Sequence, residues 1–428
     1  ACATPSGGGG GGGGGANVIP ETASNQPQRK VDEGARKLFE QAVGLYKKSS
    51  ANPPYGQIEG LLERAIDADE NFARAYYNMG VLKQEQDDLD GAVEFYQKAH
   101  EKDGTFAAPL VNIGMIYIAQ GKEEEAFDIF LRASEVEKFN PQAHVNLAVI
   151  YRKRGDYAKS VENVRKALAG DSTSVAAYNN LAKVYFELEK FDLARLVCIN
   201  ALQFEENNAD IHNTLGLIYL ELKSVTLALR EFRQVVEADP SYFEAHMNIG
   251  AISLSTRDYQ AALDHFGKAT KLRPEHTEAL LSLAVSHRSI GELEKAVELY
   301  DKVLSLDAEN AQAFFNKAVM AHEIRAALAE NPDDAIKHYQ EAIELYRKFL
   351  QFEKEGDSTA RQEADRRIAN CSELIGAQEE LKQILKEQAE MDAADAAAAE
   401  GGGGDGGDGG DDGGDGGAGG DGGDGGNP

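Results

Sequence analysis

The sequence is poor in cysteine, in long apolar runs and in basic charge. It has only three cysteines, Cys2, Cys198 and Cys371, in 428 residues, and such a set does not indicate a disulfide framework. No apolar run approaches the roughly 18 residues that a spanning helix needs, so we predict no transmembrane segment. Acidic residues outnumber basic ones by 72 to 44, for a net charge of −28. This balance argues against a nucleic-acid footprint, which requires a basic stripe.

The sequence also lacks the motifs of common catalytic sites. His322 and Glu323 resemble the start of a zinc-protease motif, but Ala326 stands where the second histidine is required. Phosphate-binding loops join a strand to a helix, whereas the glycine runs of this chain lie in its ends. We therefore expect no enzymatic activity and no cofactor.

Glycine and aspartate dominate the two ends of the chain. Gly7 to Gly15 are continuous glycine, and the residues after Gly401 are almost entirely Gly and Asp. Ten acidic residues lie from Asp392 onward, which leaves a charge of about −18 for the residues before them. Because these ends cannot bury enough apolar surface to fold, we expect a disordered tether over residues 1–30 and a disordered acidic tail over 392–428.

The residues between these ends contain a period of 34. An apolar anchor recurs at this spacing, at Leu45, Met79, Ile113, Leu147, Leu181, Leu215, Ile249 and Leu283. The next residue is small: Gly80, Gly114, Ala148, Ala182, Gly216, Gly250 or Ala284. The residue seventeen beyond the anchor is often aromatic, as in Tyr96, Phe130, Phe232, Phe266 and Tyr300. Small residues let two helices approach closely and large ones fill the space between units, so the period indicates stacked helix pairs.

These columns resemble the tetratricopeptide repeat (TPR) family over about residues 39 to 352, in nine units. The resemblance implies an all-α, right-handed superhelical solenoid over residues 31–352. The ninth unit departs from the pattern: Lys317 replaces the apolar anchor, and about five residues are inserted around 326–331. The Glu-, Gln- and Lys-rich stretch from Arg361 to Met391 predicts a C-terminal helix within 353–391 that caps the last repeat.

The repeat register also assigns the remaining cysteines and three histidines. Cys198 falls in the aromatic column and Cys371 lies among apolar residues, so we expect both to be buried. His144, His212 and His246 share one repeat position. Helices pack about 8 to 10 Å apart, too far for equivalent residues to share a zinc ion with ligands at roughly 2 Å. We interpret these histidines as core-lining and expect no metal.

The column just before the anchor is the candidate binding site. It reads Asn78, Asn112, Asn146, Asn180, Thr214, Asn248, Ser282 and Asn316. In TPR arrays this position is expected to look onto the concave groove, where amides can pair with a peptide backbone. The predicted partner-binding set is Asn78, Asn112, Asn146, Asn180, Asn213, Asn248, Asn316, Tyr77 and Met247. The alternative is that these asparagines bond locally between helices.

The neighbouring positions refine this interpretation. Apolar residues flank the amides, which suits a helix or strand laid into a groove. The family's clamp for a terminal carboxylate needs basic and Asn residues, and Val81 and its equivalents break it, so binding of chaperone tails is not expected. Arg152, Lys153 and Arg154, with Lys183 nearby in register, are interpreted as a solvated turn or as a receptor for an acidic partner.

The start of the sequence resembles the end of a bacterial lipoprotein signal. A small residue precedes Cys2 and a flexible stretch follows it, as at a lipid attachment site. The resemblance implies a lipid on Cys2, and Ala3 favours the periplasmic face of the outer membrane. An unmodified thiol in a cytoplasmic protein is the alternative.

Together these features predict a non-catalytic scaffold that binds a protein or peptide partner in its groove. The plan resembles TPR lipoproteins of gliding-motility and pilus assemblies, which implies a component of a bacterial envelope assembly. An adaptor that presents substrates to a separate enzyme, and a soluble cytoplasmic adaptor, are the alternatives.

Overall fold

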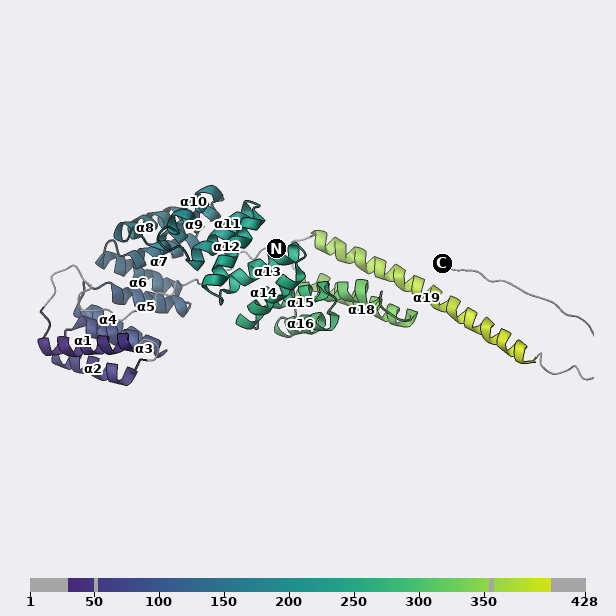
Figure 1. The fold of residues 1–428 in the computed structure, drawn as a ribbon, viewed down its shortest axis with the longest axis horizontal. Coiled ribbons are helices and arrows are strands. Elements are labelled where there is room, and N and C mark those ends of the chain that lie inside the picture. The colour runs from purple at the N-terminus through teal and green to yellow at the C-terminus, as the bar shows by residue number, and fades with distance from the viewer. Residues whose placement is uncertain (1–29, 50–52, 354–357, 402–428) are drawn as a thin grey trace, which may run out of the picture. The chain divides into compact units, whose positions relative to one another are not determined.

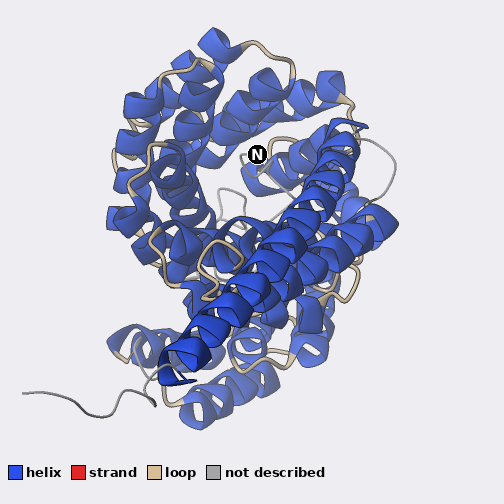
Figure 2. Cartoon of the chain, turned by 90° about the vertical axis from the view of Figure 1, so that its right-hand side faces the viewer, coloured by secondary structure: helices blue, strands red, loops and turns tan. Residues whose placement is uncertain are grey.

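A computed structural model describes residues 30–49, 53–353 and 358–401. Within these ranges the chain forms nineteen α-helices, one π-helix and no strand (Figures 1 and 2). They divide into two compact units, one ending at Glu292 and one beginning at Leu293. In the described part of the chain, no helix combines the length and apolar character required to cross a bilayer. The all-α fold predicted from the sequence is confirmed.

The first unit is a stack of helix pairs. The first helices of the pairs are α1 (Glu33–Lys48), α3 (Ala73–Glu85), α5 (Ala108–Ala119), α7 (Pro141–Lys153), α9 (Val175–Glu187), α11 (Ala209–Glu221), α13 (Phe243–Ser255) and α15 (Thr277–Ser289). The second helices are α2 (Tyr55–Ala68), α4 (Leu89–Lys102), α6 (Glu123–Val136), α8 (Tyr157–Gly170), α10 (Phe191–Ala201), α12 (Val225–Ala238) and α14 (Tyr259–Leu272). Each second helix contacts its own first helix and the first helix of the next pair, which gives the predicted solenoid.

The size of the residue after the anchor matches the side chain that faces it. A Cβ on Gly114 would lie 2.5 Å from the Phe130 ring, and a Cβ on Gly216 would lie 2.6 Å from the Phe232 ring. The pairs Gly80–Tyr96 and Gly250–Phe266 are equally close. Where the small residue is Ala182, the facing position holds Cys198, which is buried and unpaired as predicted. The spacing of the two helices is therefore kept by compensation: a glycine faces an aromatic ring, and the larger Ala182 faces the smaller Cys198.

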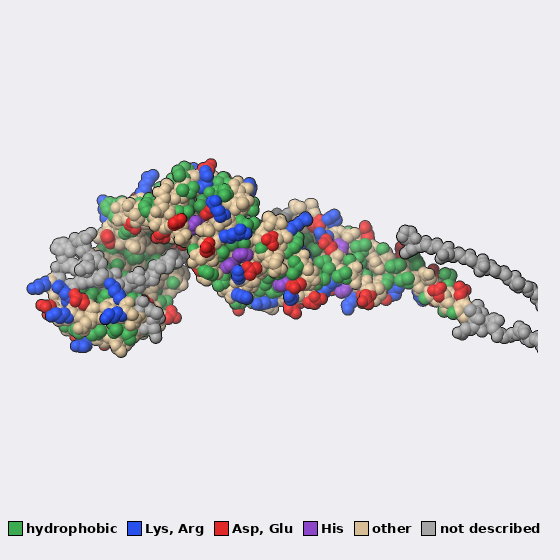
Figure 3. Space-filling model, viewed as in Figure 1, with side chains coloured by type: hydrophobic (Ala, Val, Ile, Leu, Met, Phe, Trp, Pro, Cys, Tyr) green, Lys and Arg blue, Asp and Glu red, His purple; other side chains and the backbone are tan. Residues whose placement is uncertain are grey.

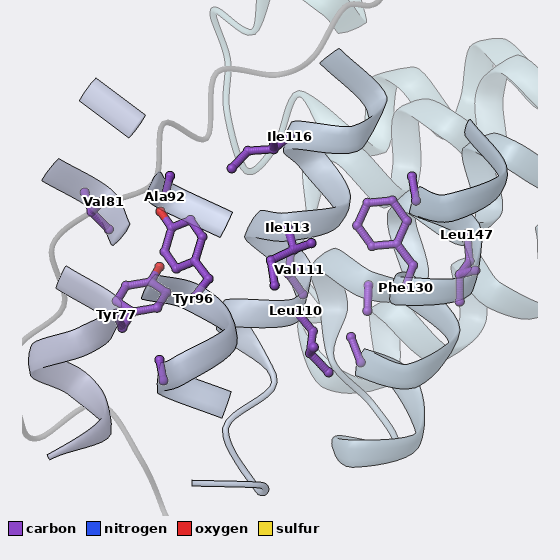
Figure 4. Packing of buried hydrophobic residues seen from close by; sticks show 14 of the residues in the cluster. Tyr77, Val81, Ala92, Tyr96, Leu110, Val111, Ile113, Ile116, Phe130 and Leu147 are labelled. Carbon is purple, nitrogen blue, oxygen red and sulfur yellow. The ribbon is translucent and has the colours of Figure 1, made fainter. Parts of the chain in front are cut away.

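Aromatic rings join one pair to the next. The Tyr77 ring of α3 lies 5.4 Å from the Tyr96 ring of α4, and Phe106, just before α5, lies 5.2 Å from Tyr77. Figure 4 shows Tyr77 and Tyr96 beside each other, with Leu110 and Ile113 of α5 among the same buried residues. This continuous core runs from α3 to α7.

The first pair corrects the predicted register. Six residues, 49–54, separate α1 from α2, whereas three residues, 222–224, separate α11 from α12. Ala42 and Val43 are buried in α1, while Leu45 is only partly buried. The structural equivalent of the anchor is therefore Ala42. The prediction of Leu45 was wrong because the additional residues before α2 shift α1 by one turn relative to a strict period of 34.

The second unit contains α16 (Leu293–Leu306), α17 (Ala311–Val319), the π-helix η1 (Met320–Arg325), α18 (Pro332–Phe352) and α19 (Ser358–Gly401). The inserted residues of the ninth repeat extend the first helix through η1 and lengthen the turn that follows it. A π-helix is the usual way for a helix to absorb an extra residue. Lys317, which replaces the apolar anchor, pairs with Asp301 of α16, so its charge is neutralised.

Helix α19 begins as a cap and continues as a free helix. Ala364 and Cys371 are fully buried in one cluster with Tyr346 and Phe349 of α18, which confirms the capping role and the burial of Cys371. Beyond this cluster α19 passes Met391, where we expected it to end, and reaches Gly401. The alanine-rich residues 393–399 explain the difference, because alanine has the highest helix propensity. Figure 1 shows this yellow end of α19 continuing past α18.

Candidate functional site

The first helices of successive pairs lie side by side in the first unit, with α9 in contact with both α7 and α11. We call the surface that they share the first-helix face. It carries the asparagine column, and hydrogen bonds cross it between neighbouring helices. Asn112 Nδ2 of α5 donates to Tyr77 Oη of α3 at 3.0 Å. Thr214 Oγ1 of α11 lies 2.8 Å from Asn179 Oδ1 of α9 and 2.9 Å from the Asp210 carbonyl, and shares its proton between these two acceptors. The local bonding that was left as an alternative is therefore present.

Six of the nine predicted partner-binding residues are buried. They are Tyr77, Asn78, Asn180, Asn213, Met247 and Asn248, each exposed by 9 % or less. Tyr77 packs against two rings, and Met247 belongs to the core cluster of Phe243 and Phe266. The prediction of a continuous open ladder was wrong at these positions, because packing within the chain buries these side chains. Among them, Asn213 Oδ1 is buried without a hydrogen-bond partner in the described structure.

Asn180 shows most clearly why an amide of this column can be structural. Its Nδ2 donates to Ser160 Oγ at 3.1 Å, and its Oδ1 accepts from Arg152 Nε at 3.0 Å. Ser160 in turn donates to the Ala148 carbonyl, and Arg152 pairs with Glu187. A buried amide with both halves bonded is a stabilising element. At the position equivalent to Ser160 in the other repeats, every 34 residues from Ala92 to Ala296, the residue is alanine. The hydrogen bonds of this network explain why Ser160 differs.

Three partly buried amides remain on successive first helices. They are Asn112 on α5, Asn146 on α7 and Asn179 on α9. Asn146 Nδ2 donates to the Gln142 carbonyl at 3.0 Å. Each side chain thus uses one half of its amide within the chain. The other half, Oδ1 of Asn112 and Asn146 and Nδ2 of Asn179, has no hydrogen-bond partner in the described structure. The predicted partner-binding set did not include Asn179, although Tyr77, Asn213 and Met247 of that set occupy the same repeat position, one residue before the column.

The basic residues near this face differ in whether they form ion pairs within the chain. Lys153 pairs with Glu123 at 3.3 Å and Arg154 with Glu124 at 2.8 Å, so these cations are matched within the chain. Lys183 is partly buried on α9 and forms no ion pair within the described ranges. Burial lowers the pKa of Lys183, although the nearby Asp210 carboxylate opposes that shift. Of these basic residues, Lys183 is the one whose side chain has no carboxylate partner in the described ranges.

The two remaining predicted residues belong to other segments of the chain. Asn316 is partly buried on α17 of the second unit. Cys2 lies outside the described residues, so its lipid stays a prediction. Among the residues that the structure describes, no three His, Cys, Asp or Glu side chains are grouped so that they could hold a metal ion.

The three histidines of the shared column have a structural role. His144, His212 and His246 are buried, as predicted. Nε2 of each bonds to the carbonyl six residues earlier, at 2.8 to 3.0 Å. Nδ1 of each bonds to a residue of the second helix: Asn163, Glu231 or His265. These imidazoles therefore tie each helix pair to the loop that precedes it.

His212 and Glu231 form a buried pair, with 2.8 Å between Nδ1 and the carboxylate oxygen. Burial alone would raise the pKa of Glu231, but hydrogen bonds from His212 and Arg230 hold it below its ordinary value. The same bond to Glu231 raises the pKa of His212. Each group thus stabilises the charged form of the other.

Models of known families match most of the repeat array. Models described as tetratricopeptide repeats match residues 73–101 and 107–140, and in overlapping stretches 179–243, 213–266, 252–313 and 281–351. A model described as a TPR repeat matches residues 149–189. A comparison with the curated proteins found no match.

Several solved structures are similar over part of the chain. YrrB, described as a TPR protein with an unusual peptide-binding site, is 26 % identical, with 44 % of this chain and 97 % of YrrB covered and a TM-score of 0.36. PilF of Pseudomonas aeruginosa is 19 % identical, with 49 % and 96 % covered and a TM-score of 0.44. The Cut9–Hcn1 hetero-tetramer of the APC/C is 14 % identical, with 67 % and 55 % covered and a TM-score of 0.49. These scores are low, so the assignment rests on the repeat models and on the helix pairs. The chain belongs to the tetratricopeptide repeat family.

Proposed function

We propose that the array is a protein–protein interaction scaffold that binds an extended polypeptide across α5, α7 and α9. The observation that supports this proposal is the set of half-used amides at Asn112, Asn146 and Asn179. One half of each amide is fixed by a bond within the chain, so the other half is held in place before a partner arrives. Fixing a group before binding reduces the entropy that binding must overcome.

The chemistry of these groups matches a peptide backbone. The two free Oδ1 atoms accept from backbone N–H groups, and the free Nδ2 of Asn179 donates to a carbonyl. Lys183, one turn after Asn179 on α9, supplies an ammonium for a carbonyl or carboxylate of the partner. Recognition through main-chain groups tolerates many side chains, so the scaffold is suited to segments that share an extended shape.

Replacing all three amides tests this function. We expect peptides selected from a display library on the purified chain to bind the variant Asn112→Ala/Asn146→Ala/Asn179→Ala at least tenfold more weakly, because each lost hydrogen bond contributes about 1 kcal/mol. The matched control is Gln97→Ala/Asn207→Ala/Gln260→Ala, which removes three exposed amides elsewhere in the first unit. Titration calorimetry measures both. Equal affinity of the two triple variants would overturn the proposal.

We also propose that the scaffold is a lipid-anchored component of an envelope assembly, at the periplasmic face of the outer membrane. The support is the resemblance around Cys2 and the glycine stretch that follows it. Mass spectrometry of the native protein is expected to find an acylated N-terminal peptide that starts at Cys2. A free Cys2 thiol preceded by intact upstream residues would contradict this.

A further inference from the structure

An apolar stripe interrupts an acidic column on the outer surface of the first unit. Fifteen residues beyond each anchor lies an exposed position of the second helix, occupied by Glu94, Asp128, Glu162, Leu196, Arg230 and Asp264 in α4 to α14. Leu196 on α10 is 54 % exposed, and Leu193 and Ile199 on the same helix are 47 % and 42 % exposed. Their spacing of three residues places them on one side of α10. We call these three residues the α10 stripe.

Basic side chains lie on both sides of this stripe. Arg165 of α8 and Arg233 of α12 occupy the repeat position of Ile199 in the pairs before and after it, and both are exposed. Neither forms an ion pair within the described ranges. Figure 3 shows hydrophobic side chains with Lys and Arg among them over the region of α8 to α12. In a chain of net charge −28, this is a surface for an acidic, apolar partner.

The free end of α19 has the complementary composition. Leu381, Ile384, Leu385 and Met391 are 41 % to 64 % exposed, and helical spacing places them on one face. We call these four residues the α19 stripe. Glu380 and Glu387 border it and are exposed. The side chains of both stripes are exposed to solvent within their own units.

We propose that the α19 stripe of one copy docks on the α10 stripe of a second copy. Apolar residues meet apolar residues, and Glu380 and Glu387 meet Arg165 and Arg233, so charge and polarity both match. Pairing of two α19 stripes with each other is disfavoured, since it brings acidic borders together. Because the two surfaces differ, the contact is heterologous and builds head-to-tail chains or closed rings. The stripes are small, so the association is weak and depends on concentration and salt.

Sedimentation of the full chain tests the contact. In low salt, we expect the mean molecular mass of the native chain to rise as its concentration increases from about 1 to about 200 μM, the range in which a small interface associates. Added salt should lower the mean mass. Leu196→Glu, which restores the acidic residue of the column, and Ile384→Glu should each weaken association at least tenfold. Leu272→Glu alters another exposed apolar residue, 40 % exposed and outside both stripes, and should leave association unchanged. Circular dichroism confirms that each variant is folded.

Charge exchange separates this pairing from other modes of association. Arg165→Glu/Arg233→Glu and Glu380→Lys/Glu387→Lys should each weaken self-association, and the chain with all four changes should recover it. A native chain that stays monomeric at the highest concentration overturns the proposal. So does sensitivity to Ile384→Glu without sensitivity to Leu196→Glu, which would indicate pairing between two α19 helices. Failure of the fourfold variant to recover also overturns it.

Discussion

Replacing Gly216 with alanine is expected to destabilise the first unit by about 1–2 kcal/mol. The added Cβ would lie 2.6 Å from the Phe232 ring, and overpacking of a well-filled core costs about 1–3 kcal/mol. The higher helix propensity of alanine offsets at most about 1 kcal/mol of this loss. Denaturant unfolding followed by circular dichroism measures the change.

A double-mutant cycle identifies the cause of this loss. Phe232→Cys alone should cost about 3 kcal/mol, because it leaves a cavity in place of a buried ring. Gly216→Ala/Phe232→Cys reproduces the pair Ala182–Cys198 of the preceding repeat, so the double variant should be more stable than the sum of the single changes by at least about 0.5 kcal/mol. Additive losses of stability would show that the side-chain sizes at positions 216 and 232 are not coupled.

Gly267 of α14 supplies the control for this experiment. A Cβ at this position meets nothing within 4 Å. Gly267→Ala should therefore raise the free energy of unfolding by about 0.5–1 kcal/mol. A loss at Gly267 as large as that at Gly216 would point to the helix backbone instead of the facing ring.

The pair His246–His265 is expected to make the first unit sensitive to acid. His246 Nε2 donates to the Pro240 carbonyl at 3.0 Å, so its Nδ1 accepts from His265 Nδ1 at 3.0 Å. Burial, and then the proximity of His246, lower the pKa of His265 to about 4. Protonation of His265 is unfavourable in the folded chain, because the charged imidazolium would be partly buried beside His246 between α13 and α14.

The sign of the pH effect follows from the two states. An unfolded histidine has a pKa of about 6.5, so between pH 6.5 and 4 the unfolded chain binds more protons at this site than the folded chain. The free energy of unfolding therefore falls as the pH is lowered through that window and changes no further below it. Because the site is partly solvated, we expect about 1–2 kcal/mol, less than the full shift implies.

An earlier repeat of the array supplies the control for acid sensitivity. In α5 and α6 the same two positions hold Leu110 and Ile129. The variant His246→Leu/His265→Ile should lose less stability than the native chain between pH 6.5 and 4, because it removes the two imidazoles and keeps every carboxylate of the native chain. Parallel pH profiles of the melting temperature would show that this pair is not responsible.

Most of the fold could be predicted from the sequence because one packing solution is repeated. A helix pair buries the same few positions in every unit, so the period, the small column and the aromatic column indicate stacked helix pairs. The prediction was wrong where chain length changes between helices, as before α2. A fixed period contains no information about a local insertion that tertiary packing absorbs.

The candidate site could be predicted only in outline. A column of asparagines indicates a shared position, but whether an amide is open depends on what lies across from it. Ser160 and Arg152 occupy both halves of Asn180, whereas Asn146 bonds only to its own helix. Which partner an amide bonds depends on the side chains of other helices and on the direction in which the amide points. The period of 34 residues predicts neither of these.

The sequence by itself determined the helix pairs, their order and the columns that they bury, since these depend on local spacing and on side-chain volume. Only the tertiary structure decided which amides remain available and which cations are already paired. It also decided that Leu196 and the end of α19 stay uncovered. Those properties depend on neighbours one repeat away, where hydrogen bonds and burial are settled by packing between helices.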